Sequence, residues 1–190
     1  MRLYALCDAD TLRSRGVDLP AFVDRVKGRN GEILQYRNKH GDITQIKNDL
    51  ILLRRLWDGF LVINDHYELV PFCDGVHLGQ EDLIRIDPNP ERAIKMLKMA
   101  IGEEKIIGLS THNREEISAA NTLDLNYIGL GAYRATSTKS DAKVLGEELD
   151  SLAKMSKHPV AAIGGVRLND TFKYVTYHVI GSGLLSEDIG

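Results

Sequence analysis

Short apolar, β-branched runs recur along the whole chain and are separated by polar segments. Runs of this length bounded by polar and turn-forming residues are typical of buried β-strands. The candidate strands are residues 3–8, 32–37, 60–65, 75–80, 105–110, 126–131, 159–165 and 178–185. The hydrophobic pattern therefore predicts eight strands of similar length.

The segments between most of these runs carry apolar residues at helical spacing. Two examples are Ile46, Leu50, Leu53 and Trp57, and Ala93, Ile94, Leu97 and Ile101. Pro90 lies in the first turn of the second predicted helix, where a missing backbone N–H has no cost. Strands that alternate with helices indicate parallel βαβ units.

Eight such units favour a closed (β/α)8 TIM barrel over an open doubly wound sheet. No G-x-G-x-x-G follows the first strand, which argues against a dinucleotide-binding fold. A barrel usually has about 250 residues, so a single domain spanning residues 1–190 would be compact. Only five residues follow Leu185, which predicts a shortened or missing last helix.

Composition narrows the class of protein without identifying it. Hydrophobic residues make up 43% and charged residues 27%, as in ordinary globular domains, and the net charge is −3. Neither this charge nor the pI of 6.1 favours binding to nucleic acid or to an anionic membrane. No apolar stretch reaches the roughly 18 residues of a membrane span. The first residues, "MRLYALCDAD", reach acidic positions too early for a signal peptide, so we expect a cytoplasmic protein.

Cys7 and Cys73 lie in apolar surroundings and are expected to be buried free thiols.

In a barrel of this kind, chemistry belongs at the carboxyl ends of the strands. The second predicted strand ends in Gln35, Arg37 and Lys39, and alternation points these three side chains in one direction. Three hydrogen-bond donors converging there suit an anionic or heteroaromatic ligand. An exposed basic strand end is the alternative.

The third and fourth strands end in acidic residues. Asn64 and Asp65 follow one strand, and Asp82 follows the next. Neighbouring strands are about 4.8 Å apart, so the two carboxylates can approach and would then repel unless a proton or cation lies between them. Mg2+ suits one or two carboxylates together with waters and substrate phosphates, although each aspartate could instead cap a helix. His77 lies within the fourth strand and is expected to pack or hydrogen-bond rather than bind zinc.

The remaining strand ends carry anion-binding residue types. Ser110 and His112 follow the fifth strand, with Asn113 as a candidate helix cap. Glycines around Gly165 and Ser182 follow the last two strands, where this fold commonly binds phosphate. The loop after the sixth strand holds Thr136, Thr138 and Lys139. Two anion sites in one pocket are therefore predicted, with this loop between them in chain order.

Several segments together resemble thiamine phosphate synthases. They are "QYRNK", "INDHYEL", "DGVHLGQEDL", "IGLSTHNREE", "YIGLGAYRATSTK" and "PVAAIGG". The resemblance runs from about residue 3 to residue 186 and implies a compact (β/α)8 barrel. It also implies a transferase that joins 4-amino-5-hydroxymethyl-2-methylpyrimidine diphosphate to hydroxyethylthiazole phosphate and releases pyrophosphate.

The resemblance implies a role for each candidate residue. Gln35, Arg37, Lys39 and Asn64 would hold the pyrimidine diphosphate, and Asp65 and Asp82 would bind Mg2+ on it. Ser110 and Lys139 would also contact the diphosphate, so that Lys139, Ser110 and Arg37 carry most of the catalytic charge stabilisation. Thr136 and Thr138 would line the thiazole side, and Gly165 and Ser182 would hold its phosphate.

The chain departs from the family pattern at some positions. Ala132 and Ala135 replace the usual prolines, Arg134 is an additional arginine, and His66 replaces an arginine. Residues 166–178 match the family's seventh helix poorly. The nearly missing last helix would leave a gap in the outer layer, and a dimer, common in the family, could cover it.

Three alternatives stay open at this stage. A TenI-like thiazole tautomerase shares the fold and could use His112 as its acid–base group, but generally lacks the full diphosphate and Mg2+ set. A barrel that binds thiamine phosphate without turnover is the second alternative. An unrelated small phosphate-binding barrel is the third.

Overall fold

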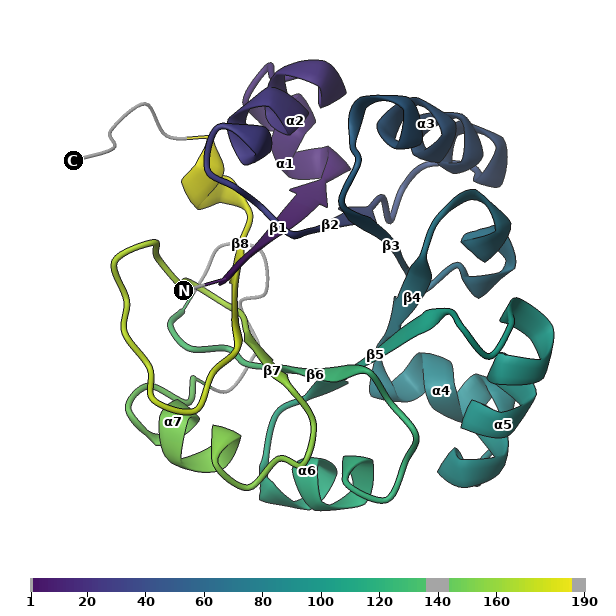
Figure 1. The fold of residues 1–190 in the computed structure, drawn as a ribbon, viewed down its shortest axis with the longest axis vertical. Coiled ribbons are helices and arrows are strands. Elements are labelled where there is room, and N and C mark those ends of the chain that lie inside the picture. Colours follow the sequence, from purple (N-terminus) through teal and green to yellow (C-terminus); the bar gives the residue numbers. More distant parts are fainter. Residues whose placement is uncertain (1, 136–143, 186–190) are drawn as a thin grey trace.

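The computed structural model describes residues 2–135 and 144–185, and its centre is a closed ring of parallel strands (Figure 1). The strands are β1 (Arg2–Asp8), β2 (Ile33–Arg37), β3 (Phe60–Asn64), β4 (Gly75–Leu78), β5 (Ile106–Thr111), β6 (Tyr127–Leu130), β7 (Val160–Ala162) and β8 (Tyr177–Ile180). Each strand pairs with the next, and β8 pairs with β1. The predicted (β/α)8 barrel is confirmed.

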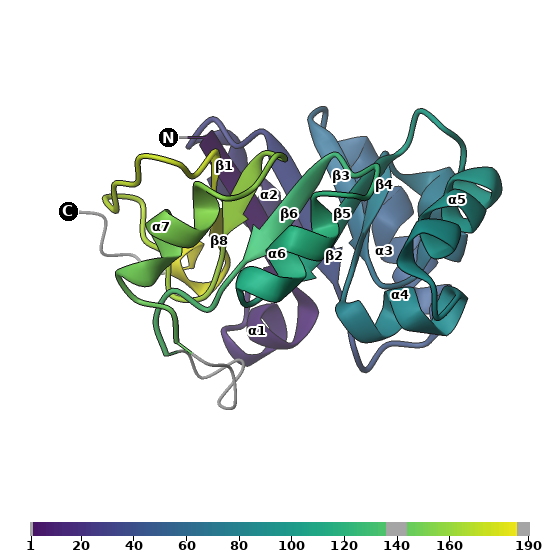
Figure 2. The same cartoon turned by 90° about the horizontal axis from the view of Figure 1, so that it is seen from below.

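Helices surround the ring on its outer side (Figures 1 and 2). They are α1 (Ala9–Ser14), α2 (Leu19–Lys27), α3 (Ile43–Leu56), α4 (Gln80–Ile86), α5 (Pro90–Ile101), α6 (Arg114–Ala120) and α7 (Glu148–Ala153), with 3-10 turns η1 (Tyr67–Phe72) and η2 (Ser182–Leu184). α1 and α4 each follow a strand almost directly, and both lie at the same end of the barrel (Figure 2). No helix in the described part of the chain is long and apolar enough to cross a membrane.

Local sequence signals explain where the helices begin. The Asp42 carboxylate accepts a hydrogen bond from the Gln45 amide, 2.9 Å away, at the start of α3. Asn89 caps α5 in the same way, and Pro90 occupies the first helical position as predicted. Asn113 is the N-cap of α6, also as predicted.

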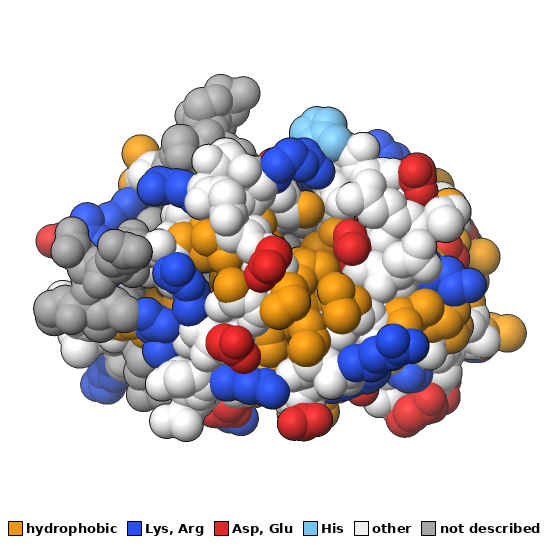
Figure 3. Space-filling model, turned by 90° about the horizontal axis from the view of Figure 1, so that it is seen from above, with side chains coloured by type: hydrophobic (Ala, Val, Ile, Leu, Met, Phe, Trp, Pro, Cys, Tyr) orange, Lys and Arg blue, Asp and Glu red, His pale blue; other side chains and the backbone are white. Residues whose placement is uncertain are grey.

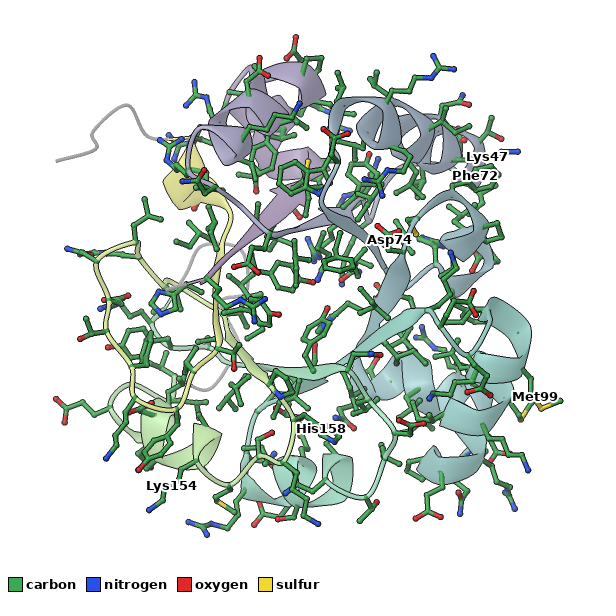
Figure 4. All side chains as sticks on the ribbon, viewed as in Figure 1. Lys47, Phe72, Asp74, Met99, Lys154 and His158 are labelled. Carbon is green, nitrogen blue, oxygen red and sulfur yellow. The ribbon has the colours of Figure 1, made fainter. Side chains whose placement is uncertain are left out.

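The buried apolar side chains form two layers, a larger one between the strands and the helices and a smaller one inside the ring of strands. The larger layer packs the outward-facing strand residues against the helices and includes the predicted Ile46, Leu50 and Leu53 of α3. The free thiols of Cys7 and Cys73 are buried, as predicted. Side chains from the strands project into the ring (Figure 4). Met99 on α5, by contrast, points away from the barrel (Figure 4). On the face that carries α2 and α3, hydrophobic side chains gather among charged ones at the surface (Figure 3).

The connection between β7 and β8 has no helix within residues 163–176. Hydrogen bonds and aromatic contacts hold this segment instead. The Asp150 carboxylate accepts hydrogen bonds from the amides of Lys173 and Tyr174, at 3.1 and 2.8 Å. Phe172 lies edge-on to His178, with ring centres 5.2 Å apart. The poor match of this segment to a helix therefore marks a real change in the outer layer.

The last predicted strand is shorter than its apolar run suggests. β8 ends at Ile180, and Ser182 begins η2 instead of continuing the strand. Gly181, with φ −109° and ψ −94°, leaves the extended conformation and turns the chain. Within the described residues that follow β8, η2 is the one helical element, which agrees with a shortened last helix.

Candidate functional site

A cavity of about 390 Å³ occupies the barrel interior and opens at the carboxyl ends of the strands. Each strand contributes to its wall, from β1 to β8 in the order Tyr4, Gln35, Asn64, His77, Ser110, Tyr127, Ala161 and Val179. Glycines make room for two of these side chains. A Cβ at Gly129 would lie 3.0 Å from the His77 ring, and one at Gly108 would overlap Tyr127.

One side of the cavity is lined by Asp8 and Arg37, and Asp65 and Asp82 lie beside it. We call these four residues the carboxylate side. Asp8 is 5% exposed at the end of β1, and its carboxylate accepts hydrogen bonds from the Thr11 amide (2.9 Å) and hydroxyl (2.7 Å). The same carboxylate forms an ion pair with the Arg37 guanidinium. Burial alone would raise the Asp8 pKa, but the Thr11 hydrogen bonds and Arg37 together hold this pKa below its ordinary value. Asp8 is therefore ionised and fixes Arg37 against the cavity wall.

Asp65 and Asp82 lie close together, as the sequence predicts. Burial and the neighbouring Asp82 carboxylate raise the pKa of Asp65, while Lys39 and Arg37 oppose the rise. Asp65 adopts φ +66°, a conformation in which aspartate is tolerated better than most residues, and its amide donates to the His77 carbonyl at 2.9 Å. Asp82 also accepts a hydrogen bond from the Gly79 amide at 3.2 Å, so its capping role and its pairing with Asp65 coexist.

The donor set of this pair fits Mg2+. Two carboxylates that repel one another require a proton or a cation between them, and oxygen-only ligands suit a hard cation. Among the described residues no group of three or more His, Cys, Asp or Glu could hold a metal, so further ligands would be waters or substrate oxygens. Asp65 and Asp82 lie beside the cavity rather than in its lining.

Another part of the cavity wall, which we call the glycine side, is formed by Gly164, Gly165 and Ser182 in the loops after β7 and β8. Both glycines have positive φ, +85° and +68°, which a side chain would strain. Within residues 2–135 and 144–185, no hydrogen bond takes the amide of Gly165 or of Ser182. These amides are donors available to an anion.

Arg134 lies next to the glycine side but is not an additional free cation there. Its guanidinium pairs with the Asp170 carboxylate at 2.6 and 2.7 Å and donates to the Gly165 carbonyl at 2.7 Å. The Arg134 amide also donates to the Gly164 carbonyl at 2.8 Å. Arg134 therefore ties the loop after β6 to the loop after β7, at the place where the usual prolines are missing.

Most of the sequence-predicted site residues come together around this cavity. Gln35, Arg37, Asn64, Ser110, Gly165 and Ser182 all line it. Lys39 is exposed and acts on the Asp65 carboxylate through its charge. Thr136, Thr138 and Lys139 lie outside the described residues.

A buried set of hydrogen bonds across the barrel interior was not predicted. The Gln35 amide nitrogen donates to the Tyr4 hydroxyl (2.6 Å), which lies 2.7 Å from the Tyr127 hydroxyl. The Tyr127 hydroxyl lies 2.9 Å from Nδ1 of His77, and Nε2 of His77 lies 2.9 Å from the Ser110 hydroxyl. His77 is thus hydrogen-bonded, as expected, but its partners Tyr127 and Ser110 line the cavity. The sequence feature that could have predicted these hydrogen bonds is the pair of tyrosines at inward-facing positions of β1 and β6.

His112 also lines the cavity, at the end of β5. Its Nδ1 lies 2.9 Å from the Glu116 carboxylate, which in turn accepts from the His112 amide. A histidine oriented by a carboxylate has the arrangement of an acid–base group.

Comparison with known proteins places this geometry in a family. A family described as thiamine monophosphate synthase matches residues 3–186. The chain is 33% identical to the thiamine-phosphate synthase of Persephonella marina over 87% of this chain and 77% of the relative. It is 31% identical to that of Lawsonia intracellularis, over 97% of this chain and 83% of the relative. The solved structure of a thiamine phosphate pyrophosphorylase from Pyrococcus furiosus superposes with a TM-score of 0.77 at 25% identity, covering 98% of this chain and 89% of that one.

Proposed function

The chain belongs to the thiamine monophosphate synthase family, whose members are transferases, and from this premise we propose how its barrel performs the reaction. The substrates are 4-amino-5-hydroxymethyl-2-methylpyrimidine diphosphate and hydroxyethylthiazole phosphate, and the products are thiamine phosphate and pyrophosphate. One observation carries the proposal: a pair of facing carboxylates, Asp65 and Asp82, lies beside Arg37 on one side of the cavity, and two glycines with positive φ lie in another part of its wall.

The carboxylate side receives the diphosphate. Arg37, held by Asp8, and the exposed Lys39 place positive charge where the leaving group gathers negative charge. Ser110 lines the cavity nearby and donates its hydroxyl to a phosphate oxygen. Lys139, by the family resemblance, adds a further cation. Asp65 and Asp82 would hold Mg2+, which when bound neutralises the diphosphate.

The glycine side receives the phosphate of the thiazole. The amides of Gly165 and Ser182 bind that phosphate without adding charge, and Thr136 and Thr138 line the approach by resemblance. With both substrates bound, the bond between the pyrimidine methylene carbon and the diphosphate oxygen breaks, and pyrophosphate leaves with the electron pair. The thiazole nitrogen then donates its lone pair to the methylene carbon. The protein positions two partners and stabilises charge, so no acid–base dyad is needed.

His112 supports a second candidate function. Its contact with Glu116 gives a TenI-like tautomerase its acid–base group on the cavity wall. The Asp65–Asp82 pair and Arg37 favour the synthase, because an isomerase has no leaving diphosphate to neutralise. A cytoplasmic location and a homodimer stay predictions from the sequence.

Incubation of the purified protein with both substrates and Mg2+ tests the proposal. Thiamine phosphate is detected by oxidation to fluorescent thiochrome, with a parallel sample that contains a chelator. We expect product that depends on Mg2+. Folded protein that makes no product would contradict the synthase function, and conversion of the thiazole phosphate alone to an isomer would establish the tautomerase.

A further inference from the structure

The hydrogen bonds from Gln35 to Ser110 form a chain whose three inner members, Tyr4, Tyr127 and His77, each have a single proton to place. We call Gln35, Tyr4, Tyr127, His77 and Ser110 the interior relay. Burial raises the pKa of both tyrosines, so their hydroxyls stay neutral. A neutral tyrosine has one O–H, and a neutral imidazole has one N–H. A proton donated in one direction is therefore not available for the other.

When His77 is neutral, only two arrangements of protons satisfy every link of the interior relay and also give each buried tyrosine proton an acceptor within it. In the first, the Gln35 amide nitrogen donates to Tyr4, Tyr4 donates to Tyr127, and Tyr127 donates to Nδ1 of His77. His77 then carries its proton on Nε2 and donates to Ser110, so the Ser110 proton is free to point into the cavity. In the second arrangement each hydrogen bond runs the other way. Ser110 donates to Nε2 of His77, Nδ1 of His77 donates to Tyr127, Tyr127 donates to Tyr4, and Tyr4 donates to the Gln35 carbonyl oxygen, which requires the Gln35 amide to be turned around. The structure has the amide nitrogen facing Tyr4, which is the first arrangement.

The two ends of the relay therefore present opposite functions to the cavity, which both Gln35 and Ser110 line. In the first arrangement Gln35 offers its carbonyl oxygen, an acceptor, and Ser110 offers a donor. In the second arrangement Gln35 offers N–H groups and Ser110 offers lone pairs. A ligand that fixes one end also fixes the other, because the hydrogen bonds between them run through Tyr4, Tyr127 and His77, which are only 1%, 2% and 9% exposed.

We infer that the interior relay couples recognition of the pyrimidine to recognition of the diphosphate. The relay selects ligands that present a donor to Gln35 and an acceptor to Ser110. This inference rests on the proposed function. A diphosphate oxygen needs the Ser110 proton, which sets Gln35 as an acceptor for the exocyclic amine of an aminopyrimidine. An oxo group in place of that amine demands the reverse arrangement and turns the Ser110 lone pairs toward the phosphate.

Tyr127→Phe breaks the relay at its centre while keeping the ring. Tyr177→Phe is the matched control. It removes the hydroxyl of another tyrosine that contacts the Tyr4 ring edge-on, at 6.4 Å between centres, but has no place in the relay. Both variants lose one oxygen atom and nothing else, so a difference between them reports on the relay.

The test measures how a pyrimidine changes the affinity for inorganic pyrophosphate. Pyrophosphate with Mg2+ is titrated by calorimetry into protein saturated with 4-amino-2-methylpyrimidine or with its 4-oxo analogue. In the unchanged protein and in Tyr177→Phe, we expect affinity about tenfold higher with the amino compound, within the usual range of coupling between two sites. In Tyr127→Phe, we expect the two affinities to differ by less than about twofold.

A second measurement reads the relay directly. Nitrogen-15 NMR of the histidine rings, with the His77 signals identified by their loss in His77→Gln, reports the tautomer. With pyrophosphate bound, we expect His77 to be neutral and protonated on Nε2. Protonation on Nδ1, or on both nitrogens, would overturn the inference.

The outcomes separate this inference from the proposed function. Binding of both ligands with no coupling, or coupling that Tyr127→Phe leaves intact, overturns the relay and leaves the synthase function standing. Failure of the unchanged protein to bind pyrophosphate at all overturns the proposed function and, with it, the relay's part in ligand selection.

Discussion

The carboxylate side and the glycine side of the cavity present different groups to an anion. Charged side chains at the ends of β1 to β4 make the first, and they are fixed by ion pairs and caps, as Asp8 fixes Arg37. Backbone amides in the loops after β7 and β8 make the second, where no helix covers residues 163–176. The difference matches the chemistry. Charge develops on a diphosphate that leaves, whereas a phosphate that stays attached to its substrate needs only to be held.

The largest effect should come from the carboxylate side. Asp65→Asn preserves the shape of the side chain, and asparagine also tolerates the φ of +66°. We expect kcat to fall about a hundredfold or more, since the leaving group loses a large part of its charge stabilisation. The exposed Asp58→Asn is the matched control in steady-state kinetics. Wild-type-like rates in folded Asp65→Asn and in Lys139→Ala would contradict the assigned roles.

A smaller effect on the same side tests whether Asp8 positions Arg37. Asp8 and Asp18 are both N-caps, of α1 and α2, but only Asp8 contacts a site residue. Asp8→Asn should lower kcat/KM about tenfold, the loss of one charged hydrogen bond. Asp18→Asn should leave kcat/KM unchanged, although it makes the same change from a charged to a neutral helix cap. Equal losses in the two variants would mean that the cap alone matters.

The glycine side should respond in affinity and not in rate. Gly165→Ala strains a residue at φ +68° and displaces an amide, so the KM for hydroxyethylthiazole phosphate should rise about tenfold with kcat within about twofold. Gly146→Ala is matched in strain, with φ +52°, but a Cβ there meets nothing within 4 Å. A fall in kcat of Gly165→Ala with an unchanged KM would contradict the proposal that the glycine side affects affinity and the carboxylate side affects rate.

The smallest effect is on stability and has a defined dependence on pH. Burial and Asp82 raise the Asp65 pKa in the fold, so ionised Asp65 destabilises the fold once the pH exceeds that raised pKa. Without Mg2+ at pH 7, Asp65→Asn should raise Tm by about 2–4 °C, the shift expected for each 1 kcal/mol in a chain of this size. The gain should shrink as the pH falls toward about 3.9, the ordinary pKa of an aspartate in the unfolded chain, and below that pH Asp65 is protonated in both states. Thermal melts over pH 4–7 check this, and a variant less stable at pH 7 would contradict it.

The contrast also explains what could be predicted from the sequence. Strand ends such as Arg37 and Asp65 follow directly from apolar runs and their alternation, so the barrel and most of the carboxylate side were predicted. Strand neighbours within a barrel are adjacent in sequence order, which is why Asp65 and Asp82 could be paired.

Contacts that cross the barrel interior were harder to predict. Tyr4 and Tyr127 lie on β1 and β6, and their hydroxyls meet 2.7 Å apart only because the ring closes. The pairing of Arg134 with Asp170 depends on the fold of residues 163–176, whose hydrophobic residues have no helical or strand periodicity from which that fold could be predicted. The sequence shows Arg134 as an additional arginine, but only the fold shows that its charge is matched by Asp170.

The division of the cavity into two sides is tested most directly by titrating two ligands into two variants. Mg2+ with pyrophosphate and hydroxyethylthiazole phosphate are each titrated by calorimetry into Asp65→Asn and Gly165→Ala. We predict that Asp65→Asn loses affinity for pyrophosphate alone, and that Gly165→Ala loses affinity for the thiazole phosphate alone. Equal losses of both ligands in either variant, or the reverse assignment, would contradict the account.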